Sequence, residues 1–150
     1  MEKILIFTVH GVRHAFPLAN VERIVTAVEI TPISGTPAVL LGTINVAGLV
    51  VPILNLRKLL GYPDKEIEIS DHFIIAKSKE AVIALVADFV ENVQEVSSQI
   101  GAGEVLPHWD WVSGFAITDQ GTVTIHSLER IVSSIDAQVR SAYPEGRFTP

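Results

Sequence analysis

The chain contains no cysteine among its 150 residues. This absence excludes disulfides, thiolate nucleophiles and cysteine-based metal sites, and it fits a reducing compartment. Basic residues are also scarce, because 11 lysines and arginines stand against 17 aspartates and glutamates, for a formal net charge of −6. An acidic chain is a poor partner for nucleic acid phosphates or anionic membrane surfaces, so neither is an expected partner.

Charge is missing altogether from residues 30–56. The stretch is long enough to cross a bilayer, but it contains Pro32, Pro37 and Pro52, and proline interrupts a membrane helix. We therefore expect two buried strands joined by a turn, with no insertion into a membrane. The sequence also lacks a P-loop and a G-x-G-x-x-G motif, so neither of these nucleotide-binding devices is present.

The sequence contains one pattern twice: strand, glycine-containing turn, strand, polar cap and helix. At an offset of 72 residues the matching pairs include Gly42/Gly114, Val51/Val123, Ile53/Ile125, Asn55/Ser127 and Leu56/Leu128. A weaker match at an offset of 69 residues relates Phe16/Leu85, Val21/Val90, Glu22/Glu91 and Ile24/Val93. The duplication predicts two small lobes, and the seam between them is the first place to expect a partner.

Short strands and frequent turns predict an all-β fold class built of small barrels with brief helices. Strands are expected at residues 4–9, 12–18, 39–46, 49–54, 72–76 and 81–86, and as a pair within 112–125. Residues 18–25 are ambiguous and also fit a short helical turn. Asn55 and Ser127 are predicted N-caps of two helices, the first of which ends at Gly61. We expect one domain over residues 1–142 and a loose tail over 143–150.

Histidine is the residue type that could carry chemistry here. His10 and His14 are spaced i, i+4, which on a helix would place both on one face as a pair of metal ligands. They flank a predicted hairpin turn instead, and are expected to face solvent. His72 and His126 are expected to be partly buried with one hydrogen-bond partner each. No catalytic set, metal site or cofactor motif assembles from these residues, so an enzyme is the least favoured class.

Two tryptophans, Trp109 and Trp111, lie in a long loop. They could cover the end of a barrel as part of the fold, or they could form a partner-contact loop, because tryptophan is common at interfaces. A different class of protein also remains open, namely a small β-barrel that binds a ligand beneath this loop.

The segment from Gly42 to Gly61, GTINVAGLVVPILNLRKLLG, resembles the signature of the CheW family of chemotaxis adaptor proteins. Flanking segments are also similar, including Val21-Glu22-Arg23-Ile24, Gly114-Phe115-Ala116 and the helix start at Ser127, so the resemblance covers roughly residues 3–135. It implies two interlocked five-stranded barrels and a non-enzymatic scaffold without a cofactor. The implied partners are the regulatory domain of a CheA-type histidine kinase and the cytoplasmic signalling tip of a chemoreceptor. The implied location is the cytoplasm, at receptor arrays on the inner membrane.

The resemblance also assigns a receptor-binding groove to Val21, Gly42 and Ala47. The family carries an arginine at the position of Ala47, and alanine lacks its charged, forked donor. The chain could therefore be a divergent CheW-like adaptor of a pilus-type or other chemosensory pathway. The family's aspartate before Leu-Arg is Asn55 here, which can cap a helix equally well.

Overall fold

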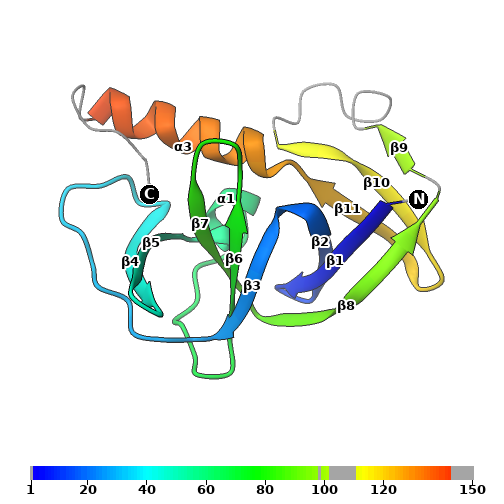
Figure 1. The fold of residues 1–150 in the computed structure, drawn as a ribbon, viewed down its shortest axis with the longest axis horizontal. Helices are drawn as coiled ribbons and strands as arrows, with labels where there is room; N and C mark the ends of the chain where they lie inside the picture. Colours follow the sequence, from blue (N-terminus) through cyan, green and yellow to red (C-terminus); the bar gives the residue numbers. More distant parts are fainter. Residues whose placement is uncertain (1, 98, 102–110, 143–150) are drawn as a thin grey trace.

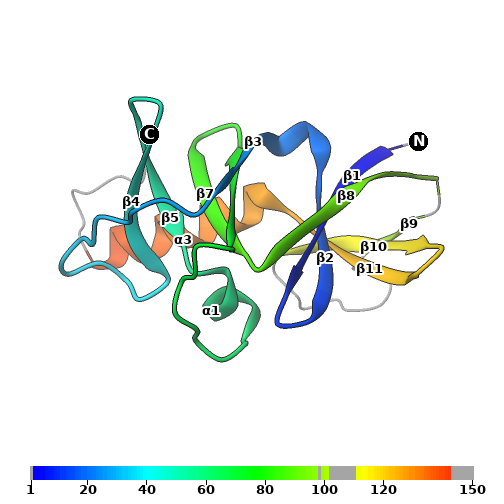
Figure 2. The same cartoon turned by 90° about the horizontal axis from the view of Figure 1, so that it is seen from below.

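The computed structural model describes residues 2–97, 99–101 and 111–142 of the chain. Two sheets, one of six strands and one of five, lie side by side. Helix α3 (Leu128–Ala142) extends from the six-stranded sheet over one face of the five-stranded sheet (Figures 1 and 2). We name each sheet with its associated cluster of buried side chains a lobe. No helix in these residues is long and apolar enough to cross a membrane.

The six-stranded lobe contains, in spatial order, β8 (Phe89–Val96), β1 (Glu2–Val9), β2 (Val12–Pro17), β11 (Gly121–His126), β10 (Val112–Thr118) and β9 (Gln99–Gly101). The five-stranded lobe contains β3 (Val21–Thr26), β6 (His72–Lys77), β7 (Val82–Ala87), β5 (Leu49–Leu54) and β4 (Leu40–Val46). Within the described ranges the helical segments are η1 (Leu18–Asn20), α1 (Leu56–Leu60) and α3 (Leu128–Ala142). The expected two-lobed, mainly β fold is confirmed, and β9 adds a sixth strand to one lobe.

The two copies of the repeat exchange a hairpin. The first copy comprises β1 to β5 and α1, yet its β1–β2 hairpin lies between β8 and β11 of the second copy. The second copy's β6–β7 hairpin lies in turn between β3 and β5 of the first. Each exchanged hairpin joins its neighbours through one antiparallel and one parallel contact, so equivalent strands follow the same order in both lobes. The lobes are therefore interlocked.

Irregularities of the strands are repeated as well. The β3–β6 register skips Glu22 between Val21 and Arg23, and the β8–β1 register skips Glu91, its equivalent, between Val90 and Asn92. Each is a β-bulge, which re-aims a side chain and increases local twist. Two glutamates thus take equivalent positions on the edge strands β3 and β8.

The predicted caps are confirmed. The Asn55 side chain accepts a hydrogen bond from the Lys58 amide at 3.1 Å, and the Ser127 hydroxyl accepts one from the Arg130 amide at 3.3 Å. Gly61 ends α1 with a φ of 79°, in the left-handed conformation that glycine adopts without steric cost. Local chemistry therefore sets the start of both helices and the end of the first.

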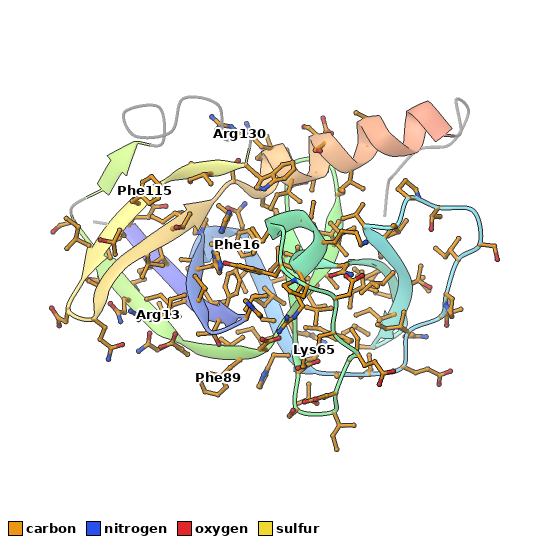
Figure 3. All side chains as sticks on the ribbon, turned by 180° about the vertical axis from the view of Figure 1, so that it is seen from behind. Arg13, Phe16, Lys65, Phe89, Phe115 and Arg130 are labelled. Atoms are coloured by element: carbon orange, nitrogen blue, oxygen red, sulfur yellow. The ribbon has the colours of Figure 1, made fainter. Side chains whose placement is uncertain are left out.

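Three hydrophobic clusters hold together the residues that the structure describes. One lies within each lobe, around Ile4 and Val123 in the six-stranded lobe and around Phe73 and Ile44 in the five-stranded lobe. The third, which we call the shared core, joins both lobes to the two helices. Its members include Leu5, Phe7, Phe16, Leu54, Leu56, Ile74, Ile83, Leu85, Leu128, Ile131, Val132 and Ile135. The interior of the seam is therefore filled with side chains, and Phe16 lies within it (Figure 3).

Three sequence-based expectations need correction. Residues 21–26 form strand β3 and only residues 18–20 are helical, because β3 pairs with the distant strand β6. The expected long loop before Trp111 is not wholly irregular, since it contains β9. His14 does not face solvent: it is 5% exposed. Its burial results from the pairing of β2 with β11, which lies more than a hundred residues further along the chain and which local pattern does not reveal.

His14 forms part of a buried network across the seam. Its Nδ1 lies 2.8 Å from Nε2 of His126, and its Nε2 lies 2.9 Å from the hydroxyl of Tyr62, which follows α1. Burial lowers the pKa of His14 to about 4. Burial, with a smaller contribution from the neighbouring His14, lowers the pKa of His126 to about 3. Both rings are therefore neutral at physiological pH.

We expect this pair to make the stability of the chain depend on pH. The folded-state pKa values lie below the value of about 6.5 in the unfolded chain, so the stabilisation is complete above that pH and is lost as the pH falls toward about 4. The slope should reach about 1.4 kcal/mol per pH unit for each histidine. Urea unfolding between about pH 7 and pH 5 measures it. The double variant His14→Leu/His126→Leu should show a flatter profile, and an unchanged slope in that variant would contradict this account.

Candidate partner-binding surfaces

The edge strands β3 and β8 present equivalent apolar residues at the margin of the seam. Val21 on β3 and Val90 on β8 both pack against the shared core. Ile24 and Val93, three residues further along each strand, are 39% and 45% exposed. Exposed apolar side chains at equivalent positions on two edge strands indicate a surface that a partner could cover.

Phe89 connects this margin to the other lobe. It begins β8, is more than half exposed, and its ring meets that of His72 on β6 edge to face, with centroids 6.0 Å apart. His72 in turn pairs with Thr26 on β3. Figure 3 shows Phe89 at the outer margin of the molecule, in contrast to the interior Phe16. We call Ile24, Phe89 and Val93 the edge stripe.

A second surface lies at one end of the five-stranded lobe. It is a hollow of about 380 Å³, which we call the lobe-end hollow. Its walls are apolar and its rim is charged; the lining residues are Val46, Ala47, Leu49, Val51, Ile75 and Val82, with Glu22, Arg23 and Lys77. Glu22 and Lys77 approach each other to 4.0 Å, whereas the Arg23 side chain has no ion pair within the part of the chain that the structure describes.

The equivalent end of the six-stranded lobe is occupied by Arg13, which stands where the five-stranded lobe has Val82. Thr8 opposes Arg13 in one hairpin and Lys77 opposes Val82 in the other, so the two positions correspond. The Arg13 Nε donates to Glu91 Oε2 at 3.0 Å, and both side chains are mostly buried. Its two Nη atoms are buried and have no partner among the described residues. One end of the molecule is therefore filled by its own arginine, while the other is open.

The chain matches the CheW-like domain family over residues 3–136. It belongs to the CheW family. It is 25% identical over 135 residues to the chemotaxis protein CheW of Thermotoga maritima, which covers 89% of each chain. It is 29% identical over 92 residues to CheW of Bacillus subtilis, covering 61% of this chain and 59% of that protein. The scaffolding protein TtCheW of Thermoanaerobacter tengcongensis has a similar structure, with a TM-score of 0.78, 26% identity, and coverage of 85% of this chain and 89% of that one.

CheW proteins are non-enzymatic adaptors of chemotaxis signalling, and the chain belongs among them. The expected fold, family and adaptor class are thereby confirmed. None of the described residues form a cluster of three or more potential metal-ligating side chains.

The structure gives different local surroundings to Val21, Gly42 and Ala47, the residues that the resemblance assigned to one receptor groove. Ala47 lies at the tip of the β4–β5 hairpin with a φ of 52°, and it lines the lobe-end hollow. The Asn45 side chain accepts a hydrogen bond from the Gly48 amide at 2.9 Å and holds this turn. Val21 lies beside the hollow, since the next two residues line it, but its own side chain contacts the shared core.

Gly42 has a backbone role. Its φ is 150°, and a Cβ added there would lie 2.1 Å from the carbonyl oxygen of Thr31. Thr31 and Thr43 exchange backbone hydrogen bonds at 2.8 and 2.9 Å, which brings the two segments into this contact. Glycine at this point of the CheW signature thus permits a close crossing of two backbones.

Trp111 is half-buried against the shared core, which agrees with a covering role in the fold. Trp109 lies outside the described residues. Ile24, Phe89, Val93 and Val82 were not among the binding residues predicted from the sequence. For Ile24 and Val93 a signal existed, because they already matched each other at the 69-residue offset.

We expect Gly42→Ala to destabilise the chain strongly. A methyl group cannot share space with the Thr31 carbonyl, so the free energy of unfolding should fall by about 3 kcal/mol or more. Gly48→Ala is the matched control: its φ is 87°, but no atom lies within 4 Å of the added Cβ, so the cost should be only about 1 kcal/mol. Urea denaturation of both variants measures the difference, and equal losses would show that the crossing is not tightly packed.

Proposed function

We propose that the chain is a cytoplasmic adaptor that couples a chemoreceptor signalling tip to the regulatory domain of a CheA-type histidine kinase. Membership of the CheW family supports this function. The observation that carries it is the presence of two separate apolar surfaces, the edge stripe and the lobe-end hollow, on different parts of one chain. Two surfaces allow two partners to bind at once.

We assign the receptor tip, a helical hairpin, to the edge stripe. A helix presents apolar side chains every three or four residues along one face, and such a face can lie along an elongated apolar surface. Ile24 and Val93 come from different lobes and Phe89 lies where the lobes meet. A receptor bound there would contact both lobes.

We assign the kinase regulatory domain to the lobe-end hollow. The six-stranded lobe supports this assignment by contrast, because at the equivalent position Arg13 occupies the space itself and pairs with Glu91. In the five-stranded lobe, Val82 stands at the position of Arg13 and the hairpin tip is apolar, so no arginine fills the hollow. An apolar side chain from the kinase would fill it, and the uncompensated Arg23 on the rim would favour an acidic neighbour.

Coupling then follows from linkage. If the receptor binds one conformation of the adaptor more tightly than another, it favours that conformation. By thermodynamic linkage, the receptor and the kinase then change each other's affinity for the adaptor by the same factor. The β3 strand belongs to both surfaces, with Ile24 in the stripe and Arg23 on the rim of the hollow. It is the shortest connection between the two partners.

We expect the double variant Ile24→Glu/Val93→Glu to weaken binding of the receptor tip at least about 10-fold, because docking would bury two unpaired charges. Binding of the kinase regulatory domain should be retained. Isothermal titration with both partners from the same organism tests this, and Ile117→Glu, an exposed apolar position on β10, is the control. If the wild-type chain binds neither partner at tens of micromolar, the function itself is wrong.

Val82→Arg should close the lobe-end hollow from within. The new guanidinium would take the position that Arg13 holds in the other lobe. It would pair with Glu22 as Arg13 pairs with Glu91. Kinase binding should weaken at least about 10-fold while receptor binding persists. Val12→Arg adds the same charge at an exposed position of β2 and should change neither affinity. Unaltered kinase binding by Val82→Arg would place the kinase elsewhere on the chain.

A further inference from the structure

A third exposed apolar region lies between two connections of the five-stranded lobe. One connection follows β3 and the other joins α1 to β6, and together they form a second hollow of about 380 Å³. Its lining residues are Ala27, Val28, Glu29, Ile30, Ile67, Glu68 and Ile69. We call this region the Ile69 patch. It shares no residue with the edge stripe or with the lobe-end hollow.

Ile69 is held outward by a rigid turn. Its side chain is 92% exposed. The neighbouring Asp71 is buried, and its carboxylate accepts hydrogen bonds from the Glu68 amide at 2.8 Å and from Lys65 Nζ at 3.3 Å. The Asp71 carbonyl also accepts a hydrogen bond from the Ala27 amide at 3.0 Å, which ties the two connections together. A surface that is already ordered loses little conformational entropy when a partner binds.

The charge around the patch is negative and only partly compensated. Lys65 lies 3.7 Å from Glu68 and 3.3 Å from Asp71, so its charge is already shared between two carboxylates. Glu29, which lines the hollow, has no ion pair within the part of the chain that the structure describes. The same holds for Glu66, which precedes Ile67 in the chain and lines an adjoining hollow that also includes Ile67. Glu66, Ile67, Glu68 and Ile69 moreover alternate acidic and apolar side chains along the sequence.

We propose that the Ile69 patch is a docking surface for a protein segment in which lysine or arginine alternates with apolar residues. The apolar side chains of such a segment would enter the hollow beside Ile67 and Ile69, and its cations would meet Glu29 and Glu66. Charge complementarity favours a basic protein segment over other occupants of the patch. An anionic membrane or a nucleic acid would be repelled, and a second copy of the chain would bring the same carboxylates into opposition.

The test is a nuclear magnetic resonance titration of the full, isotope-labelled chain. The probes are two short synthetic peptides of equal length, one alternating lysine with leucine and the other alternating glutamate with leucine. The lysine peptide should shift the amide signals of residues 27–30 and 66–69, and the glutamate peptide should not. Shifts spread over the whole acidic surface, or equal shifts with both peptides, would overturn the proposal.

Variants separate the apolar and the charged contributions. Ile69→Ser and the double variant Glu29→Gln/Glu66→Gln should each weaken binding of the lysine peptide about fivefold or more. Val50→Ser removes an exposed apolar side chain outside the patch and should leave the affinity unchanged. Because Ile69 is exposed, its replacement should not unfold the chain, which thermal unfolding verifies. Unchanged peptide affinity in Ile69→Ser, or binding of the wild-type chain to neutral lipid vesicles that Ile69→Ser abolishes, would refute a protein partner.

Discussion

The exchange of hairpins between the two copies is the constraint on which the structure depends. Neither copy completes a sheet with its own strands, because β1–β2 lies in the sheet of the second copy and β6–β7 in that of the first. The strands that cross over also supply the shared core, through Phe7 and Phe16 from one hairpin and Ile74 and Ile83 from the other. Burial of these apolar side chains is the dominant favourable term in folding, and here it fixes the lobes against each other. The binding surfaces inherit their relative positions from it.

Duplication gave two equivalent lobe ends, and side-chain replacement made them different. In the six-stranded lobe, Arg13 and Glu91 fill the end, and the hairpin tip carries Thr118 and Asp119. In the five-stranded lobe the equivalent hairpin residues are Val46 and Ala47, beside an open hollow. Two lobe ends built from equivalent strands can therefore differ, one occupied by an arginine and the other hollow, depending on a few residues. The two lobe ends of the adaptor are therefore not interchangeable.

Much of the fold could be predicted from local pattern, because turns and caps are local chemistry. The repeat at 72 residues correctly located the strand pairs around Ala47-Gly48 and Gly121, and Asn55 and Ser127 cap their helices as expected. What local pattern could not show is which distant strands pair. That single unknown accounts for the burial of His14 and the strand conformation of residues 21–26. It also hid the binding surfaces: Ile24 and Val93 acquire a common role only once β3 and β8 are known to be edge strands.

The interlocked topology also has a consequence for synthesis on the ribosome. When a nascent chain has emerged as far as Gly61, β3 still lacks its neighbour β6, and the β1–β2 hairpin lacks both β8 and β11. The apolar side chains of Phe7 and Phe16 then have no second lobe to cover them, and α3, which completes the shared core, is translated after the strands of both lobes. Folding of the two lobes must therefore wait until β11 and α3 have emerged, as expected for a topology dominated by long-range pairing. During that interval the emerging first half is exposed to aggregation, and assistance by chaperones would matter most there.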